Sequence, residues 1–587
     1  MSIMAGIVAR RQNVTVPEEL SSVFLGGLSR LATDRPYVHR QPGVLLSKLD
    51  LGFYGHPGHS VRPGGSALMV VGEPLVTDTA NGRCSGRHSD MERLHDSFEQ
   101  RDWGVLKQAH GLFAAAYYDP SDRLLAIATD KLGLRHLYYW NNDDYFVFST
   151  TLRLLEALDL VPKRMDVRAL VETAGLGAPL GDRSPYYDIS TLTAGQMIII
   201  AAGDVRSNRY WHWDNIRVSD KAEPELVGDV HNAFCRAVGD RLGTDTTTVA
   251  FLSGGLDSRS IVAAVRELGA DVHTINCSIP GTQDRVYSAA FAQEIGSFHY
   301  EIPIAVFDPE FFSTIRDQWE TCPERLRHPP SRPQLLWSGN DGCVSLGHLW
   351  LDEELVDLMR QGHTDAAVAR LFRSRGIGLS LRLFKARVAE RCRELLHQGF
   401  REEIDRFHCE DPARNLWLVL ALNNARKVLR AYAEDIDQYR FDFQLPYFDD
   451  RFLTSILAIP IDLCLRHRLY DKWIRRFSPA VTAVPWQTYA GHVSCPIQWE
   501  DPPLDQWEAS YRQTDLRQRA SLLRRLRLMR IRDVPGGLVR RSVLSAARVA
   551  YQLNFKDCTS ILEPALLYHR YSRPSGGEFV LPEITSR

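Results

Sequence analysis

A six-residue segment, Ser253 to Ser258, has the residue types that hold a phosphate chain. Gly254 and Gly255 let the backbone approach a ligand closely, and successive N–H groups at the start of a helix form an anion-binding nest. The two serine hydroxyls add donors. Asp257 would repel a bare phosphate, so we expect it to bind the Mg²⁺ that neutralises pyrophosphate as it leaves. The alternative is an ordinary helix N-cap beside a glycine turn.

The elements expected around this loop favour a ligand site. Residues 248–252 indicate a short buried strand, residues 260–268 carry apolar side chains at helical spacing and stop at Gly269, and residues 272–276 follow as the next strand. This alternation predicts a parallel sheet with helices on both faces, with the loop between a strand and a helix. From about residue 365 onward the pattern is mainly helical.

The first half of the chain shows a different pattern. Apolar runs at 111–118 and 124–128 flank a polar turn, and runs at 137–140 and 145–148 flank a second one. Paired runs of this kind predict stacked antiparallel β hairpins.

Length and composition set the organisation. At 587 residues the chain exceeds what one hydrophobic core usually supports, so we expect two domains, 1–215 and 225–587. A net charge of -2 gives no reason to expect a nucleic acid partner, and no apolar stretch is long enough to span a membrane. The ten cysteines include no CxxC pair, which favours reduced thiols and a cytoplasmic location.

An arginine-rich stretch, residues 517–541, contains nine arginines and a single acid, Asp533. Two interpretations stay open. The arginines form either the solvated face of amphipathic helices or a docking surface for an acidic peptide or partner.

Several motifs together resemble the asparagine synthetase superfamily along nearly the whole chain. The strongest is Phe251 to Ser258, and residues 446–451 and 470–476 resemble the family's proline-aromatic segment and its lysine-containing helix. Short matches at 111–114, 130–133, 137–139 and 148–149 resemble its glutaminase domain. The resemblance implies an Ntn-like antiparallel β sandwich followed by an ATP-pyrophosphatase domain. It also implies that ATP is bound by Ser253, Gly254, Gly255, Leu256, Asp257 and Ser258.

The nucleophile of that glutaminase is missing here. The family domain begins with a cysteine whose thiol attacks glutamine and whose free α-amine serves as base. The matching position is Ala5, preceded by four residues. We therefore expect no ammonia release from glutamine, and the amine must come from elsewhere.

Relatives that lost this cysteine include β-lactam synthetase, carbapenam synthetase and the lasso-peptide cyclases. Residues 484–496 are most similar to the lasso cyclases. That resemblance implies a precursor peptide whose Asp or Glu side chain is adenylated and then attacked by the peptide's N-terminal amine, which closes a macrolactam. It further implies a separate leader-binding protein and a leader protease as partners.

Two segments depart from the family pattern. In residues 338–344, Cys343 stands where relatives have a metal-binding aspartate, so Asp341 is the candidate replacement, with a solvated loop acid as the alternative. Asn340 stands where relatives place a residue acting on the amine. Residues 484–496 lack the family's lysine that stabilises charge on the adenylate, so His492 and Lys472 are the candidates.

Two further acids resemble family positions. Asp284 resembles an acid near the nucleotide, although a helix N-cap explains it nearly as well. Asp442 resembles an acid that orients or deprotonates the attacking amine, with an ordinary surface carboxylate as the alternative.

Three rival functions stay open. The first is an asparagine synthetase that uses free aspartate and ammonia. The second is a small-molecule cyclase of the β-lactam type. The third, suggested by the altered 338–344 segment, is a nucleotide-binding scaffold without catalysis.

Overall fold

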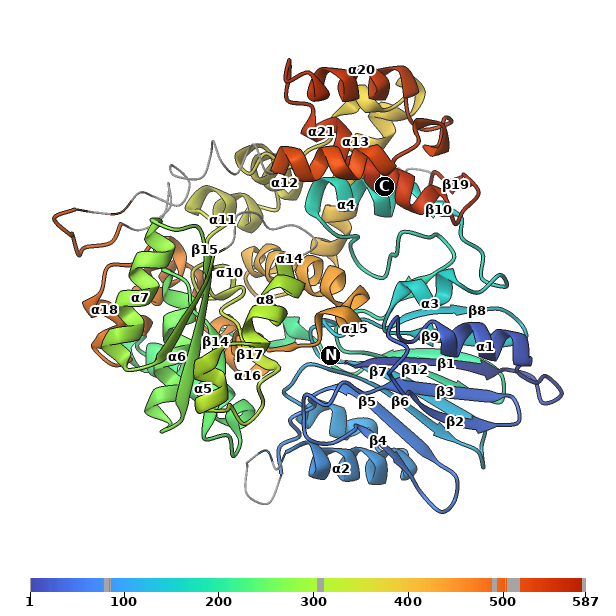
Figure 1. Ribbon diagram of the computed structural model, residues 1–587, viewed down its shortest axis with the longest axis horizontal. Helices are drawn as coiled ribbons and strands as arrows, with labels where there is room; N and C mark the ends of the chain where they lie inside the picture. The colour runs from blue at the N-terminus through green and yellow to red at the C-terminus, as the bar shows by residue number, and fades with distance from the viewer. Residues whose placement is uncertain are drawn as a thin grey trace.

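A computed structural model describes residues 2–78, 84, 86–303, 311–487, 494–501, 503 and 518–582. The N-terminal part contains two six-stranded antiparallel sheets, with strand orders β11-β8-β9-β1-β3-β2 and β13-β12-β7-β6-β5-β4 (Figure 1). The strands are β1 (Ile3–Ala9), β2 (Tyr37–Gln41), β3 (Val44–Leu49), β4 (His59–Val61), β5 (Ala67–Gly72), β6 (Phe113–Asp119), β7 (Leu124–Thr129), β8 (Tyr138–Asn141), β9 (Tyr145–Ser149), β11 (Ser190–Thr191), β12 (Gln196–Ala201) and β13 (Asp204–Arg209). The predicted hairpins are confirmed as the antiparallel pairs β6–β7 and β8–β9.

Four helices accompany these sheets: α1 (Glu18–Gly26), α2 (Arg87–Glu99), α3 (Leu152–Glu156) and α4 (Val167–Leu176). A short strand, β10 (Met165–Asp166), pairs in parallel with β19 (Phe579–Val580). The end of the described chain thus returns to the N-terminal part.

The C-terminal part is built on a five-stranded parallel sheet with the order β16-β15-β14-β17-β18. Its strands are β14 (Thr247–Phe251), β15 (Asp271–Ser278), β16 (Phe298–Pro303), β17 (Leu335–Trp337) and β18 (Asp442–Gln444), and its first helices are α5 (Glu223–Leu242), α6 (Leu256–Glu267), α7 (Gln283–Ile295), α8 (Phe311–Glu320) and α9 (Pro323–Arg327). The predicted parallel sheet with intervening helices is confirmed. The helix α6 starts four residues before the predicted 260, because Gly255 in extended conformation already caps it.

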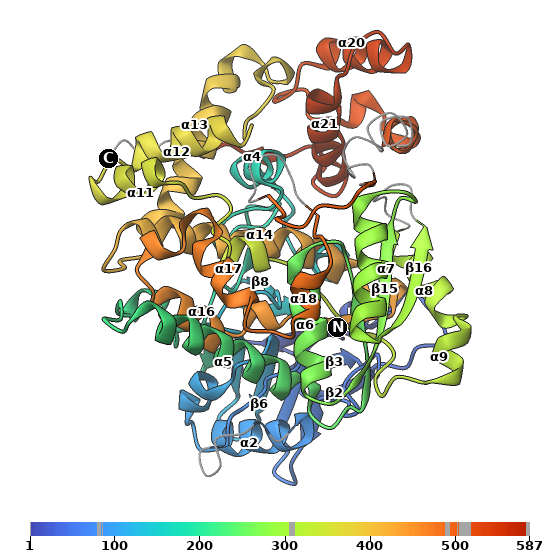
Figure 2. The ribbon, with the colours of Figure 1, turned by 90° about the vertical axis from the view of Figure 1, so that its left-hand side faces the viewer.

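The rest of the chain is mainly helical, as predicted (Figures 1 and 2). The helices are α10 (Gly342–Ser345), α11 (Glu353–Arg360), α12 (Thr364–Ser374), α13 (Ala386–Asp405), α14 (Ala413–Glu434), α15 (Ile436–Tyr439), α16 (Asp450–Leu457), α17 (Arg468–Ile474), α18 (Ala480–Ala483), α20 (Arg541–Gln552) and α21 (Thr559–Ser572). None of the helices in the described part of the chain combines the length and apolarity needed to cross a bilayer.

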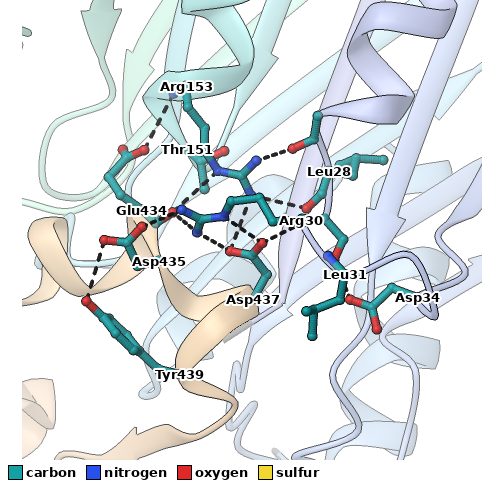
Figure 3. Close-up of polar contacts among 12 residues, drawn as sticks. Leu28, Arg30, Leu31, Asp34, Thr151, Arg153, Glu434, Asp435, Asp437 and Tyr439 are labelled. Carbon is teal, nitrogen blue, oxygen red and sulfur yellow. Dashed lines mark hydrogen bonds and ion pairs between the residues drawn. The ribbon is translucent and has the colours of Figure 1, made fainter. Parts of the chain in front are cut away.

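A network of ion pairs joins the two parts (Figure 3). Asp437 of α15 is fully buried and accepts a hydrogen bond from the Arg30 Nε at 3.0 Å, while Arg153 approaches it to 3.4 Å. Arg30 also contacts Asp435 at 2.7 Å, and the carboxylate of Glu434 accepts a bond from the Leu152 backbone N–H at 2.8 Å. The N-terminal part is therefore fastened to the end of α14 and to α15.

Candidate active site

The glycine loop between β14 and α6 is shaped by close packing. A Cβ on Gly254 would lie 2.9 Å from the Asp284 Cα and 3.0 Å from the Gln283 carbonyl oxygen, so only glycine fits. The Gly254 N–H donates to Asp284 Oδ1 at 2.6 Å, and the hydroxyls of Ser253 and Ser258 lie 3.0 Å apart. The loop is thus held by its own hydrogen bonds at the start of α6, and a helix N-terminus beside a cavity is a position that suits phosphate oxygens.

A cavity of about 750 Å³ opens beside this loop. It lies at the carboxyl ends of the parallel strands, where open α/β sheets bind their ligands. One part of its wall is polar, from the glycine loop and from Ser338, Gly339 and Asn340. The other part is apolar and includes Phe251, Phe311, Phe312, Val428, Phe443 and Trp486.

Two carboxylates lie at or near the polar end: Asp257, which is half-buried and lines the cavity, and Asp341, which is buried. Asp257 Oδ1 accepts a hydrogen bond from the Tyr470 hydroxyl at 2.6 Å, and its Oδ2 accepts one from the Cys343 backbone N–H at 3.1 Å. Asp341 accepts a bond from the Asn424 amide on Oδ1, but its buried Oδ2 has no partner among the described residues. Burial raises the pKa of Asp257 to about 6 and that of Asp341 to about 7, and the charge of Asp257 adds to the latter.

These acids fit a divalent cation. Mg²⁺ commonly takes one or two protein carboxylates and fills its remaining positions with phosphate oxygens and water. No larger group of His, Cys, Asp and Glu ligands exists among the described residues, which agrees with such a partial set. Gly342 is required here, because a Cβ on it would lie 2.5 Å from Asp257 Oδ1. Burial raises the pKa of the Cys343 thiol well above its usual value, and a soft thiol ligand suits Mg²⁺ less well than a carboxylate.

Of the predicted site residues outside the loop, Asp284 and Asn340 line the cavity, whereas Asp341 is not among its lining residues. Asp284 lines it, but its Oδ1 is used by the Gly254 N–H, so it shapes the loop. Asn340 lines it directly. Asp341 approaches from behind, through its contact with Asn424 of α14.

Asp442 does not reach the cavity, which corrects its expected role at the amine. The residue is fully buried and its carboxylate is bound by Arg135 at 3.0 Å and by the Tyr54 hydroxyl at 2.8 Å. Although burial opposes ionisation, Arg135 holds the pKa of Asp442 down to about 2. A carboxylate this acidic is a poor base, and its partners come from the N-terminal part.

Lys472 is also placed outside the cavity lining. Its Nζ pairs with Glu223 Oε2 at 2.6 Å, and its side chain is half exposed. The structure thus gives it a surface ion pair in place of a contact with the adenylate. His492 lies outside the described residues.

Sequence patterns missed several residues that form the site. Tyr470 lies in the segment that resembles the family's lysine helix, yet it is the tyrosine and not the lysine that reaches Asp257. His467 lines the cavity and has a positive φ of 60°, like Arg466 before it at 52°. Asn424 carried no sequence signal, because it lies on one face of a long helix.

Ala5, which stands where the family has its nucleophilic cysteine, has no access to solvent. Ala5 is fully buried inside β1, where it pairs with Ser47 of β3 and Ser149 of β9. The preceding Met4 donates its backbone N–H to Thr150 Oγ1 at 3.0 Å. No free amine stands at this position, as the extra residues before Ala5 led us to expect.

Comparison with known proteins agrees with this organisation. The family model described as a glutamine amidotransferase domain matches residues 78–211, and the one described as asparagine synthase matches residues 229–318. A glutamine-hydrolysing asparagine synthetase 3 of Bacillus subtilis is 27% identical over 221 residues, which cover 36% of this chain and 35% of that protein. The amidase chyE of Penicillium rubens is 24% identical over 266 residues, which cover 43% and 39%.

The chain thus spans little more than a third of the length of these curated relatives. Among solved structures, glutamine phosphoribosylpyrophosphate amidotransferase from B. subtilis matches 53% of this chain and 92% of its own with 12% identity and a TM-score of 0.25, too low to support a conclusion. The two family models follow one another in the order of an amidotransferase-like part and a synthase part, and the parallel-sheet part carries the glycine loop. The chain therefore contains a segment that matches the glutamine amidotransferase model and a segment that matches the asparagine synthase model, and it is similar to curated asparagine synthetases over about a third of its length.

Proposed function

We propose that this protein is an ATP-dependent synthetase that adenylates an Asp or Glu side chain of a precursor peptide and closes a macrolactam with the peptide's N-terminal amine. A carboxylate oxygen attacks the α-phosphorus of ATP, and the bond to pyrophosphate breaks. The amine then attacks the acyl carbon, AMP leaves, and the amine loses its proton. The observation that carries the proposal is the shared cavity of the glycine loop, Asp257 and an apolar wall.

The chain's own residues support each stage. The 253–258 loop lines the cavity at the start of α6, where the first N–H groups of the helix and the Ser253 and Ser258 hydroxyls would bind the phosphates. Asp257 and Asp341 are the residues that would hold Mg²⁺, which when bound would supply charge neutralisation at the leaving pyrophosphate. Tyr470 and the Cys343 N–H orient the Asp257 carboxylate. The aromatic side chains exclude water, which would otherwise hydrolyse the activated carboxylate.

The cavity favours a peptide over a free amino acid. Among its described lining residues there is no lysine and no arginine, whereas Asp257, Asp284 and Asp471 are all acidic. Free aspartate carries an α-carboxylate that would need a cationic partner in a buried site. In a peptide this carboxylate is replaced by a neutral amide, and the neighbouring side chains can contact the apolar wall. Leader recognition and leader removal by separate proteins belong to the same proposal.

One finding favours a second candidate, synthesis of asparagine from aspartate and ammonia, because curated relatives are named asparagine synthetases. Purified protein is given Mg-ATP with a candidate precursor peptide, and separately with aspartate and ammonium, and pyrophosphate and product mass are recorded. We expect pyrophosphate with the peptide alone and a product lighter by one water. Release with aspartate and ammonium would favour the second candidate, and no release in any mixture would refute both.

A further inference from the structure

A small second cavity lies at the junction of the two parts, remote from the glycine loop. Its volume is about 30 Å³, while a single water needs about 10–15 Å³. Three arginines line it: Arg209 at the end of β13, Arg406 directly after α13, and Arg426 of α14. The space suits one small ion with at most a water molecule.

Arg426 lacks the partner that a buried guanidinium needs. The residue is only 4% exposed, its Nε has no hydrogen-bond partner among the described residues, and its Nη1 reaches only the Gly181 carbonyl oxygen at 3.5 Å. One helical turn later, Arg430 is equally buried and its Nε and Nη1 also lack partners in the described part of the chain. Leaving such charges uncompensated in a protein interior is costly. Burial, together with Arg430, lowers the pKa of Arg426 to about 10.

The acids of the cavity compensate Arg426 only in part, because burial and Arg430 lower the pKa of Arg426 by more than the negative charge of Glu403 raises it. The acid Glu403 lies 3.2 Å from the Arg406 Nε, and Asp214 accepts the His408 backbone N–H at 3.1 Å. The buried indole N–H of Trp211 has no acceptor among the described residues. The Asn423 Oδ1 lacks a donor there as well, which a water beside the ion would supply. Two N–H donors without partners among the described residues thus belong to side chains that line a cavity with three guanidinium groups and two carboxyl groups.

We propose that this cavity binds a small monovalent inorganic anion such as chloride, with Arg426 Nε and Trp211 Nε1 as its donors. Trp211 belongs to the N-terminal part and Arg426 to α14, so the ion joins the two parts. The Arg426 guanidinium packs closely against the N-terminal part, since a Cβ on Gly133 would lie 2.9 Å from Arg426 Nη2. The same helix presents Asn424 to Asp341, so the ion also helps to fix the helix that supports the larger cavity.

Bromide tests the site in the unaltered protein. Crystals of the full chain grown in sodium bromide are examined for anomalous scattering at the bromine edge. We expect a peak between Arg426 Nε and Trp211 Nε1. A cavity that holds only water, with no anomalous peak at a bromide concentration that labels other surface sites, would overturn the proposal.

Thermal unfolding gives an independent readout. In chloride, compared with gluconate at equal ionic strength, we expect the unfolding midpoint to rise by about 1–3 °C. Arg426→Gln should abolish this difference. The matched control Arg393→Gln alters an exposed arginine of α13 that pairs with Glu390 and should keep it. An equal midpoint in both salts for the unaltered protein would contradict anion binding.

Discussion

Carboxylates at the interface between the two parts have cationic partners, whereas those at the large cavity have none within ion-pair distance among the described residues. At the interface, Asp442 contacts Arg135 at 3.0 Å and Asp450 contacts Lys131 at 2.6 Å. At the cavity, Asp257 is half-buried and Asp341 is buried, and among the described residues neither forms an ion pair with a lysine or arginine. The same residue type is thus stabilised as an anion in one place and left uncompensated in the other.

The pKa values follow this difference. Despite burial, Arg135 lowers the pKa of Asp442 to about 2, whereas burial without a cation raises those of Asp257 and Asp341 to about 6 and 7. The acids at the interface find their cationic partners within the chain itself. The cavity acids are completed only by a cation from outside, which is the property expected of a metal site.

The largest effect is expected at the cavity. Asp257→Asn removes the proposed metal ligand but keeps the shape of the side chain, so pyrophosphate release should fall by about 100-fold or more. Because a half-buried charge without a cationic partner is also removed, thermal stability should stay level or rise. The control Asp365→Asn changes an exposed acid paired with Arg401 and should leave release unchanged. Full activity of Asp257→Asn would remove this residue from the site.

At the interface the same kind of change should act on stability. Arg135→Met leaves the fully buried Asp442 without its guanidinium, and the free energy of unfolding should drop by about 3–5 kcal/mol. Urea unfolding measures it. Adding Asp442→Asn to this variant should recover part of the loss. A drop below about 1 kcal/mol in the Arg135→Met variant alone would show that this ion pair does not stabilise β18.

The sequence predicts the glycine loop and both sheet types because their signals are local. Strand, glycine turn and helix follow each other within residues 248–268, and each hairpin of the N-terminal part is contained in some twenty residues. The sequence could also single out Asp341, since it lies two residues before Cys343 in the altered segment.

Long-range pairing explains what the sequence could not predict. The sequence predicts a catalytic role for Asp442, but the structure shows it bound to Arg135, which lies 307 residues earlier in the chain. Lys472 points away from the cavity to Glu223, while Tyr470 on the same short helix points in. The two residues are two positions apart on α17 and therefore lie on nearly opposite faces, and the packing of the helix against its neighbours decides which face is turned to the cavity.

Opposite pH dependences should separate the two kinds of acid. For Asp341 the folded pKa of about 7 exceeds the unfolded value near 4, so the folded state binds the extra proton and stability falls as pH rises from about 4 to 7. For Asp442 the folded pKa of about 2 is depressed, so its stabilisation is present above about pH 4 and is lost towards pH 2.

Urea unfolding at pH 4.5 and 7.5 measures this difference. Asp341→Asn should remove on the order of 2 kcal/mol from the decline in stability between these pH values. Asp365→Asn should keep the decline of the unaltered protein. A decline that is the same in Asp341→Asn would show that this carboxyl group is not protonated in the folded protein.

The smallest effect is expected at the surface. Lys472→Ala breaks a half-exposed ion pair with Glu223, so stability should change by less than about 1 kcal/mol and pyrophosphate release by less than about twofold. Steady-state release assays provide the check. A large loss of pyrophosphate release in a variant that folds normally would show that Lys472 takes part in adenylation.

The transfer of an oxygen atom tests the central claim most directly. The acceptor carboxylate of a candidate precursor peptide is labelled with ¹⁸O, the peptide is incubated with the protein and Mg-ATP, and the nucleotide product is analysed by mass spectrometry. Adenylation predicts AMP that carries one ¹⁸O, because the attacking carboxylate oxygen stays on the α-phosphorus when the amine displaces it. Formation of ADP, or of AMP without the label, would contradict the account.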